Sequence, residues 1–233
     1  MVTSKNICFI FARGGSQGLV NKNIRPFAGK SLLEYTINFA CALEFVDKVF
    51  VSSENDDIKK ISKLQSVTVI ERPEVFASNE ANEIDAWKHA INWVRKNEGD
   101  FENFLSLPCT APLRTKENVY SCFRKISNTK PFIVSVTPAK FNPFFNLVKK
   151  DSFDSSITLV NQAGYHRRQD APQIFAITPI SYIAKPDEIM RREKIWDGRV
   201  FGVEVPASNA VDIDDINDFT YAEYLFKKRL SQN

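Results

Sequence analysis

A cluster of glycines and cations directly follows the first apolar run of the chain. The residues that could contact an anion there are Ala12, Arg13, Gly14, Gly15, Ser16, Gly18, Lys22 and Asn23. Glycines let backbone N–H groups approach an anion closely, and arginine and lysine share their charge with phosphate oxygens. The pattern therefore predicts a phosphate site at the end of a buried strand. By itself the motif is equally compatible with an ordinary strand-to-helix turn.

The spacing in this cluster differs from that of two common phosphate loops. No G-x-x-x-x-G-K-[ST] string occurs, and Arg13 stands where the dinucleotide-binding motif G-x-G-x-x-G needs its first glycine. These departures favour nucleotide chemistry other than that of P-loop kinases or NAD-dependent enzymes.

A second group of chemically competent residues lies near the C-terminus, where Asp212 and Asp214 flank Ile213. In an extended segment this alternation places both carboxylates on one side and the isoleucine on the other. Two carboxylates held together repel each other unless a cation lies between them, and their hard oxygen atoms suit Mg²⁺. Asp214 or Asp215 could instead cap the final helix, a role that leaves Asp212 unexplained.

Strand-like and helix-like patterns alternate along the first two thirds of the chain. Apolar strand patterns cover residues 6–12, 48–52, 67–70, 104–107 and 132–136. Helical patterns begin at a capping box formed by Ser31 and Glu34, at a cap at Ser53, near residue 80, at Thr115 and near residue 215. Strands separated by helices predict an α/β fold with a mainly parallel sheet, whose ligands lie beyond the carboxyl ends of the strands. The Arg13 loop and the segments 52–53, 72–73 and 108–114 fall at that edge.

Residues 138–172 depart from this alternation. Short alternating stretches, an aromatic cluster at residues 141–145 and a turn at residues 162–164 predict hairpins rather than another strand–helix unit. An exposed aromatic arm commonly covers a partner subunit, and an antiparallel edge of the same domain is the alternative. Because no linker or repeat divides the chain, we expect one domain over residues 1–233 with an inserted arm over 138–172.

Composition restricts the class of protein. The chain of 233 residues is 43% hydrophobic and 25% charged, with a formal net charge of +3. That charge is too small and too evenly spread to predict nucleic-acid binding. The sequence has neither a signal-peptide pattern nor an apolar run of membrane-spanning length, and its four cysteines form no C-x-x-C pair, which favours reduced thiols. We therefore expect a cytoplasmic protein without a nucleic-acid or membrane partner.

Five motifs occur in the order typical of the acylneuraminate-type CMP-sugar cytidylyltransferases, the family of the CMP-sialic acid synthetases, and the chain resembles that family. The segment Ala12–Gly18 with Lys22 and Asn23 resembles the family's A-R-G-G-S-K-G…K-N signature. The other matching segments are Arg72-Pro73, residues 110–114, Arg168-Gln169-Asp170 and Asp212-Ile213-Asp214. The resemblance implies a Rossmann-like nucleotidyltransferase fold with a mainly parallel sheet and a small antiparallel dimerisation arm.

The resemblance also implies a Mg²⁺-dependent cytidylyltransferase that couples CTP to an acidic 3-deoxy-2-ulosonic, sialic acid-like sugar, giving CMP-sugar and pyrophosphate. The implied catalytic residues are Arg13, Lys22, Asp212 and Asp214, and the two aspartates would bind the metal. The implied nucleotide-binding residues are Ala12, Arg13, Gly14, Gly15, Ser16, Lys22, Asn23 and Arg72. Arg168 and Gln169 would bind the sugar, and the arm would build a homodimer and lean over the partner's active site.

Two departures from the family fall where the identity of the sugar would be recognised. Pro108 replaces the glutamine of the motif L-Q-P-T-S-P-L-R, and residues 176–183 lack the Asn-Gly of the motif N-G-A-I-Y-I. These changes favour nucleotide activation in general over N-acetylneuraminate as the acceptor. The alternatives are CTP-dependent activation of another acid, either Kdo-like or not a sugar, and a non-catalytic nucleotide-binding protein.

Overall fold

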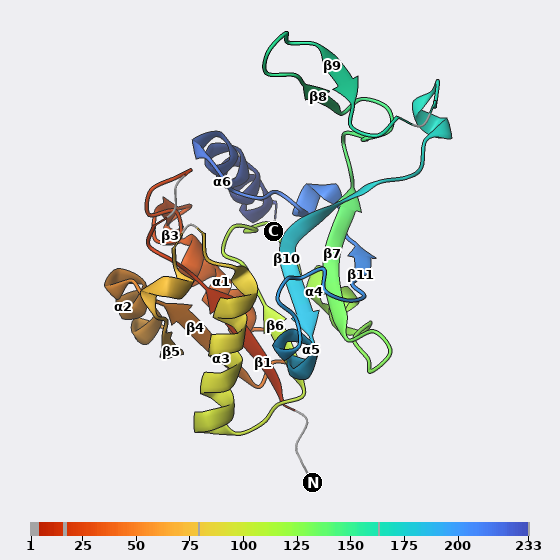
Figure 1. Cartoon of the computed structure of the whole chain (residues 1–233). Coiled ribbons are helices and arrows are strands. Elements are labelled where there is room, and N and C mark those ends of the chain that lie inside the picture. The colour runs from red at the N-terminus through yellow and green to blue at the C-terminus, as the bar shows by residue number, and fades with distance from the viewer. Residues whose placement is uncertain (1–4, 16–17, 79, 163, 233) are drawn as a thin grey trace.

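A single mixed sheet forms the centre of the protein. The computed structural model describes residues 5–15, 18–78, 80–162 and 164–232. Within this part, seven strands pair in the order β11-β7-β10-β6-β1-β4-β5 (Figure 1). Their bounds are β1 Asn6–Phe11, β4 Lys48–Ser53, β5 Thr68–Glu71, β6 Asn103–Ser106, β7 Phe132–Pro138, β10 Phe175–Ala184 and β11 Phe201–Glu204. Only β10 runs antiparallel to its neighbours, β6 and β7, so the predicted α/β fold with a mainly parallel sheet is confirmed.

Helices connect these strands and cover both faces of the sheet. Their bounds are α1 Leu32–Cys41, α2 Asp56–Leu64, α3 Glu83–Glu98, α4 Lys116–Phe123, α5 Pro186–Met190 and α6 Ile216–Leu230. Cys8 and Ile10 of β1 belong to the core cluster that includes residues of α1, α2, α4 and α6. Ile7 and Phe9 belong to the cluster formed with α3 and α5. Because both faces are covered, β1 is a continuous apolar run, as parallel strands require.

Three helices begin at predicted capping signals. The Ser31 hydroxyl accepts a hydrogen bond from the Glu34 backbone N–H, and the Ser31 backbone N–H donates to the Glu34 carboxylate. Thr115 caps α4, and Asp215 caps α6 by accepting from two backbone N–H groups of the first turn. Asp215 is therefore the capping residue of the acidic segment, which leaves Asp214 free of that role.

The predicted cap of α2 is wrong. Asn55, not Ser53, is the N-cap, and its side chain accepts a hydrogen bond of 3.0 Å from the backbone N–H of Ile58. Ser53 is the last residue of β4 and pairs with Glu71 of β5, so the strand continues one residue beyond the predicted strand pattern, which ends at residue 52.

The segment between β7 and β10 projects away from the sheet (green to cyan in Figure 1). It carries the hairpin of β8 (Val148–Lys150) and β9 (Ile157–Leu159) and the short 3-10 helix η2 (Arg168–Asp170), so the predicted hairpin is confirmed. Large apolar side chains that are exposed in the arm include Phe141, Phe145, Leu147, Val148, Phe153 and Ile157. The assignment of this arm to dimerisation stays a prediction.

None of the helices in the described part of the chain is long and apolar enough to cross a membrane. The four cysteines are free thiols; Cys8, Cys109 and Cys122 are buried and Cys41 is exposed.

Candidate active site

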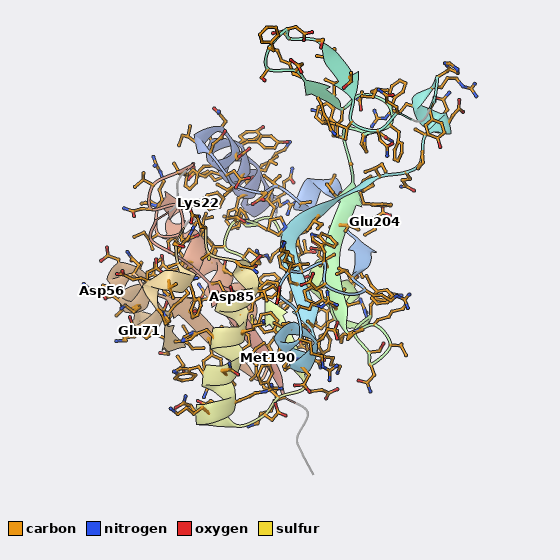
Figure 2. The ribbon with its side chains drawn as sticks, in the orientation of Figure 1. Lys22, Asp56, Glu71, Asp85, Met190 and Glu204 are labelled. Atoms are coloured by element: carbon orange, nitrogen blue, oxygen red, sulfur yellow. The ribbon has the colours of Figure 1, made fainter. Side chains whose placement is uncertain are left out.

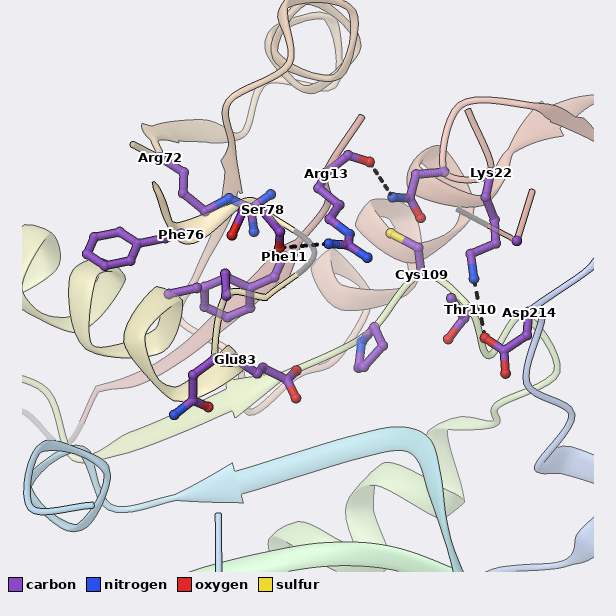
Figure 3. A pocket seen from close by; sticks show the side chains of 16 residues that line it. Phe11, Arg13, Lys22, Arg72, Phe76, Ser78, Glu83, Cys109, Thr110 and Asp214 are labelled. Atoms are coloured by element: carbon purple, nitrogen blue, oxygen red, sulfur yellow. Dashed lines mark hydrogen bonds and ion pairs between the residues drawn. The ribbon is translucent and has the colours of Figure 1, made fainter. Parts of the chain in front are cut away.

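A cavity of about 530 Å³ opens where the central parallel strands end. Five of the predicted site residues line it: Arg13, Lys22, Asn23, Arg72 and Asp214. They come from the segments after β1 and β5 and from the segment before α6, so the sheet brings together residues separated by about 200 positions. Figure 3 shows the side chains of Arg13, Lys22 and Asp214 turned toward the same space. The position agrees with the rule that ligands of such sheets lie beyond the carboxyl ends of the strands.

Lys22 is held beside the acidic segment by two contacts. Its Nζ lies 3.6 Å from Oδ1 of Asp214 and donates a hydrogen bond to the backbone carbonyl of Ile213. The backbone N–H of Ile213 donates in turn to the carbonyl of Thr110, at 3.0 Å, in the loop after β6. The Lys22 side chain is only 12% exposed whereas that of Asp214 is 80% exposed. A fixed ammonium group and an open carboxylate therefore share one wall of the cavity.

Asp212 and Asp214 lie on the solvent side of their segment, as predicted, and Ile213 is fully buried. The pKa of Asp212 is raised, first because nearby protein atoms desolvate its carboxyl and also because the negative charge of Asp214 is close. A divalent cation would relieve this repulsion, and Mg²⁺ is commonly held by one or two carboxylates together with substrate phosphates. The described residues contain no group of three or more His, Cys, Asp or Glu side chains arranged for a metal. The pair therefore fits Mg²⁺ only as such a shared, two-carboxylate site.

Arg13 crosses the cavity from the end of β1. Its Nη1 donates to the carbonyl of Ser78 at 3.0 Å and, more weakly, to that of Ala77 at 3.4 Å. The side-chain amide of Asn23 donates to the Arg13 carbonyl at 3.1 Å. The guanidinium group itself therefore donates only to backbone carbonyls, and no carboxylate among the described residues pairs with its positive charge. Arg13 can therefore neutralise an anionic ligand.

Arg72 and Gly14 are joined by a carboxylate that the sequence patterns did not single out. The Glu54 carboxylate accepts a hydrogen bond of 2.6 Å from Nη2 of Arg72 and another of 2.8 Å from the backbone N–H of Gly14. Burial disfavours the ionised form of Glu54, but these hydrogen bonds outweigh it and lower the pKa of its carboxyl. Arg72 also donates to the carbonyl of Ala12 at 2.9 Å and is 5% exposed. Glu54 thus fixes Arg72 against the glycine-rich loop and occupies the Gly14 N–H that was expected to face a phosphate.

The remaining predicted residues lie in different places. Ala12 is buried at the end of β1, and Gly15 has open space where a side chain would be. Ser16 lies outside the described residues. Arg168 and Gln169 line a separate cavity of about 450 Å³ in the arm. Within one chain the structure therefore does not bring the predicted sugar-binding residues to the cavity that Arg13, Lys22 and Asp214 line.

Two functional candidates, Glu54 and Glu83, escaped the sequence patterns because neither belongs to a motif. Glu54 directly follows β4, and Glu83 is the first residue of α3 and lines the cavity. The signal that could have found both is position: each comes after a parallel strand has ended and before the next helix has begun or completed its first turn.

Comparisons with known proteins agree with this geometry. A family model described as cytidylyltransferase matches residues 7–193. The chain is 27% identical over 231 residues to post-translational flagellin modification protein B of Campylobacter coli, covering 97% of each chain. It is 26% identical over 231 residues to CMP-N,N′-diacetyllegionaminic acid synthase of Campylobacter jejuni, again covering 97% of each.

A solved structure of CMP:2-keto-3-deoxy-manno-octonic acid synthetase complexed with CTP has a similar fold. Its TM-score is 0.69 at 14% identity, covering 97% of this chain and 100% of that chain. At this identity the likeness supports the fold, and the Rossmann-like nucleotidyltransferase architecture is confirmed. Since the family model spans most of the sequence, the chain belongs to the cytidylyltransferase family.

Proposed function

We propose that the protein transfers CMP from CTP to the anomeric hydroxyl of an acidic 3-deoxy-2-ulosonic sugar of the sialic acid type and releases pyrophosphate. The single observation that carries this proposal is the cavity in which Arg13, Lys22 and Asp214 converge at the carboxyl edge of the sheet. Two cations and a carboxylate facing one space suit a triphosphate with its metal. The relatives named for CMP-sugar synthesis support the class of acceptor.

The reaction needs no nucleophile from the protein. The anomeric oxygen attacks the α-phosphorus of CTP and loses its proton, while the bond from that phosphorus to the oxygen bridging the α- and β-phosphates breaks. Pyrophosphate leaves with the electron pair of that bond. Lys22 and Arg13 would neutralise the charge that develops on the departing group and would hold the phosphates so that the α-phosphorus lies in line with the attacking oxygen.

We assign metal binding to Asp212 and Asp214, which would hold Mg²⁺ so that it polarises phosphate oxygens and lowers the pKa of a nearby hydroxyl. Asp215 keeps α6 in place behind them through its cap, and Lys22 fixes the backbone of the intervening Ile213. These two anchors limit the movement of both carboxylates when a charged substrate arrives.

We assign sugar binding to Arg168 and Gln169 in a homodimer whose arm reaches over the partner's active site. This assignment is supported by the distance of these residues from the cavity of their own chain and by the exposed apolar side chains of the arm. Arginine can bind a carboxylate through two parallel hydrogen bonds, which suits an acidic sugar. We also propose a cytoplasmic location, consistent with four free thiols.

Pyrophosphate release tests the proposed function directly. Purified protein with Mg²⁺ and CTP should release pyrophosphate with one or more of N-acetylneuraminate, legionaminate, pseudaminate and Kdo, and the responding sugar names the acceptor. Replacing CTP with ATP, GTP or UTP serves as the nucleotide control. Absence of release with every acid, in a preparation that binds CTP, would contradict the acceptor class while keeping the nucleotide site.

A further inference from the structure

Glu83 is a carboxylate in a cavity built for anions. The described lining contains two carboxylates, and their surroundings differ: Asp214 lies 3.6 Å from the ammonium group of Lys22, whereas no cationic side chain contributes to the pKa of Glu83. Figure 3 shows the Glu83 side chain extending from α3 into the cavity on the side opposite Arg13. An unpaired carboxylate would repel a triphosphate or an acid if either charge came near it.

Among the residues that the structure describes, none gives the Glu83 oxygens a full hydrogen bond. Asn82, the neighbouring lining residue, has both ends of its amide in use, because its oxygen caps α3 and its nitrogen donates to the carbonyl of Glu193. The indole N–H of Trp87 approaches Glu83 but is left without a hydrogen-bond partner by geometry. Trp87 is completely buried, and its ring centroid lies 5.5 Å from that of Tyr182, so closely packed aromatic side chains form the base of this corner.

Partial removal of water from the Glu83 carboxyl group raises its pKa. Crowding by protein atoms raises the pKa of Glu83 to about 7, although the residue remains open to the cavity. Burial is the main cause of the raised pKa of the Tyr182 hydroxyl, and the negative charges of Glu83 and Asp212 raise it further. A ligand that donates a hydrogen bond to Glu83 would offset the cost of keeping this group ionised and partly dry.

Both substrates of the proposed reaction carry such donors. Their charged parts belong near Arg13 and Lys22, and the uncharged remainder of each is rich in hydroxyl groups. Carboxylates accept hydrogen bonds from sugar hydroxyls, as acidic residues do from the ribose of dinucleotides. We propose that Glu83 is a substrate-recognition residue whose carboxylate accepts a hydrogen bond from a hydroxyl group, either of the ribose of CTP or of the acceptor sugar. This inference rests on the proposed function.

An acidic residue in the first turn of a helix also interacts favourably with the helix dipole, and α3 has two of them, Glu83 and Asp85. Asp85 lies on α3 (Figure 2) and does not belong to the described lining of the cavity. Asp85→Asn therefore removes a carboxylate from the same helical turn without removing one from the cavity, and it is the matched control for Glu83→Ala and Glu83→Gln.

Binding measurements separate the two sources of the hydroxyl. Calorimetry would compare CTP with its 2′-deoxy and 3′-deoxy analogues, and steady-state pyrophosphate release would give the KM of the acceptor and kcat. If the ribose is the donor, the wild-type protein binds CTP about tenfold or more tighter than one of the deoxy analogues, and so does Asp85→Asn. Glu83→Ala should bind CTP and that analogue with similar affinity. If the acceptor is the donor, Glu83→Ala raises the acceptor KM about tenfold or more, keeps kcat within about twofold and leaves the nucleotide ratios unchanged.

Glu83→Gln keeps an oxygen that can accept a hydrogen bond. It should therefore lose less affinity than Glu83→Ala in whichever of the two measurements, nucleotide binding or acceptor KM, shows an effect. Unchanged nucleotide ratios together with an unchanged acceptor KM would overturn the assignment. Failure of the proposed function has a different signature, since the wild-type protein would then bind no CTP or release no pyrophosphate with any acid. If CTP binds but no acid is turned over, the nucleotide ratios decide alone, and ratios unaffected by Glu83→Ala overturn the assignment.

Discussion

At the scale of single residues, the two oppositely charged side chains of the Lys22–Asp214 pair differ in their exposure to solvent. Lys22 is largely buried and fixed by a backbone carbonyl, whereas Asp214 beside it is open to solvent. An ion pair whose carboxylate is open to solvent contributes little to stability. The Lys22–Asp214 pair is therefore better explained by ligand binding than by folding stability. Substitution of Asp214 can separate a role in binding from a role in stability.

Asp214→Asn should reduce kcat by about 100-fold or more, because one preorganised electrostatic contact to the reacting group is worth roughly 10²–10³ in rate. The thermal midpoint should stay close to that of the wild-type protein, since the carboxylate is 80% exposed. Binding of Mn²⁺ in the presence of CTP, followed by electron paramagnetic resonance, should weaken in parallel. Asp215→Asn is the control, because asparagine caps a helix as well as aspartate does. Wild-type kcat in Asp214→Asn would remove its metal and phosphate role.

Glu83 predicts a measurable pH dependence of stability in the free protein. Because desolvation raises its pKa from 4.5 to about 7, the folded state binds this proton more tightly than the unfolded state does. The group's contribution to stability is complete below the unfolded pKa and is lost as the pH rises through 7. Trp87 and Tyr182 are the groups that face it.

Glu83→Gln, which cannot ionise, should therefore gain thermal stability relative to the wild-type protein as the pH is raised. Melting curves at pH 5.5 and pH 8 without ligand test this, with Asp85→Asn as the control for loss of a first-turn carboxylate. A difference in thermal midpoint between Glu83→Gln and the wild-type protein that is the same at both pH values would contradict the raised pKa.

At the scale of elements, the loop after β1 and the segment before α6 are pressed against each other. A Cβ atom added at Gly18 would collide with the backbone carbonyl oxygen of Asp214, whereas one added at Gly15 would meet open space. The collision involves backbone on both sides, so no side chain can rotate away to relieve it. The glycine at position 18 is therefore required by the close approach of the two site segments.

Gly18→Ala should lose about 1–3 kcal/mol of unfolding free energy, the usual cost of overpacking, and should also lose activity because both aspartates shift. Gly15→Ala should stay within about 0.5 kcal/mol of the wild-type protein, as expected for a substitution without a steric conflict. Urea denaturation of the two variants provides the comparison. Equal stability of the two would show that the segments can separate without cost.

At the scale of the whole molecule, the arm places apolar side chains where the single chain cannot cover them. Phe153, at the turn of the β8–β9 hairpin, is 98% exposed, and Phe141 is 51% exposed. Contiguous exposed apolar surface commonly marks a protein–protein interface. A second copy of the chain is the partner that would also bring Arg168 and Gln169 to a nucleotide cavity.

Light scattering should therefore give a mass of twice the 26.6 kDa of the chain. The double variant Phe141→Asp/Phe153→Asp should be monomeric and folded, and its acceptor KM should rise because the partner's arm is missing. Leu64→Asp is the control, as Leu64 is 76% exposed at the end of α2, away from the arm. A monomeric wild-type protein with full activity would exclude the arm from the partner's site.

Local patterns were sufficient for most elements, because caps and apolar periodicity depend on residues within one or two turns. The capping box at Ser31 and Glu34 is an example, and so is the start of α4 at Thr115. The cap of α2 could not be decided locally. Ser53 and Asn55 are both good caps, and Ser53 is withdrawn from that role because it pairs with Glu71 across the sheet.

The sequence by itself determined the family, the α/β fold and the sheet edge at which the Arg13 loop and the segment with Arg72 would meet, since motifs and alternation are local properties. Tertiary structure alone decided which partner each charge has. Glu54 meets Arg72 because β4 and β5 end side by side, and Ile213 meets Thr110 because α6 shares one core cluster with the residues that follow β6. Such contacts join residues far apart in the chain, and they form only when the helices pack against the sheet and align its strand ends.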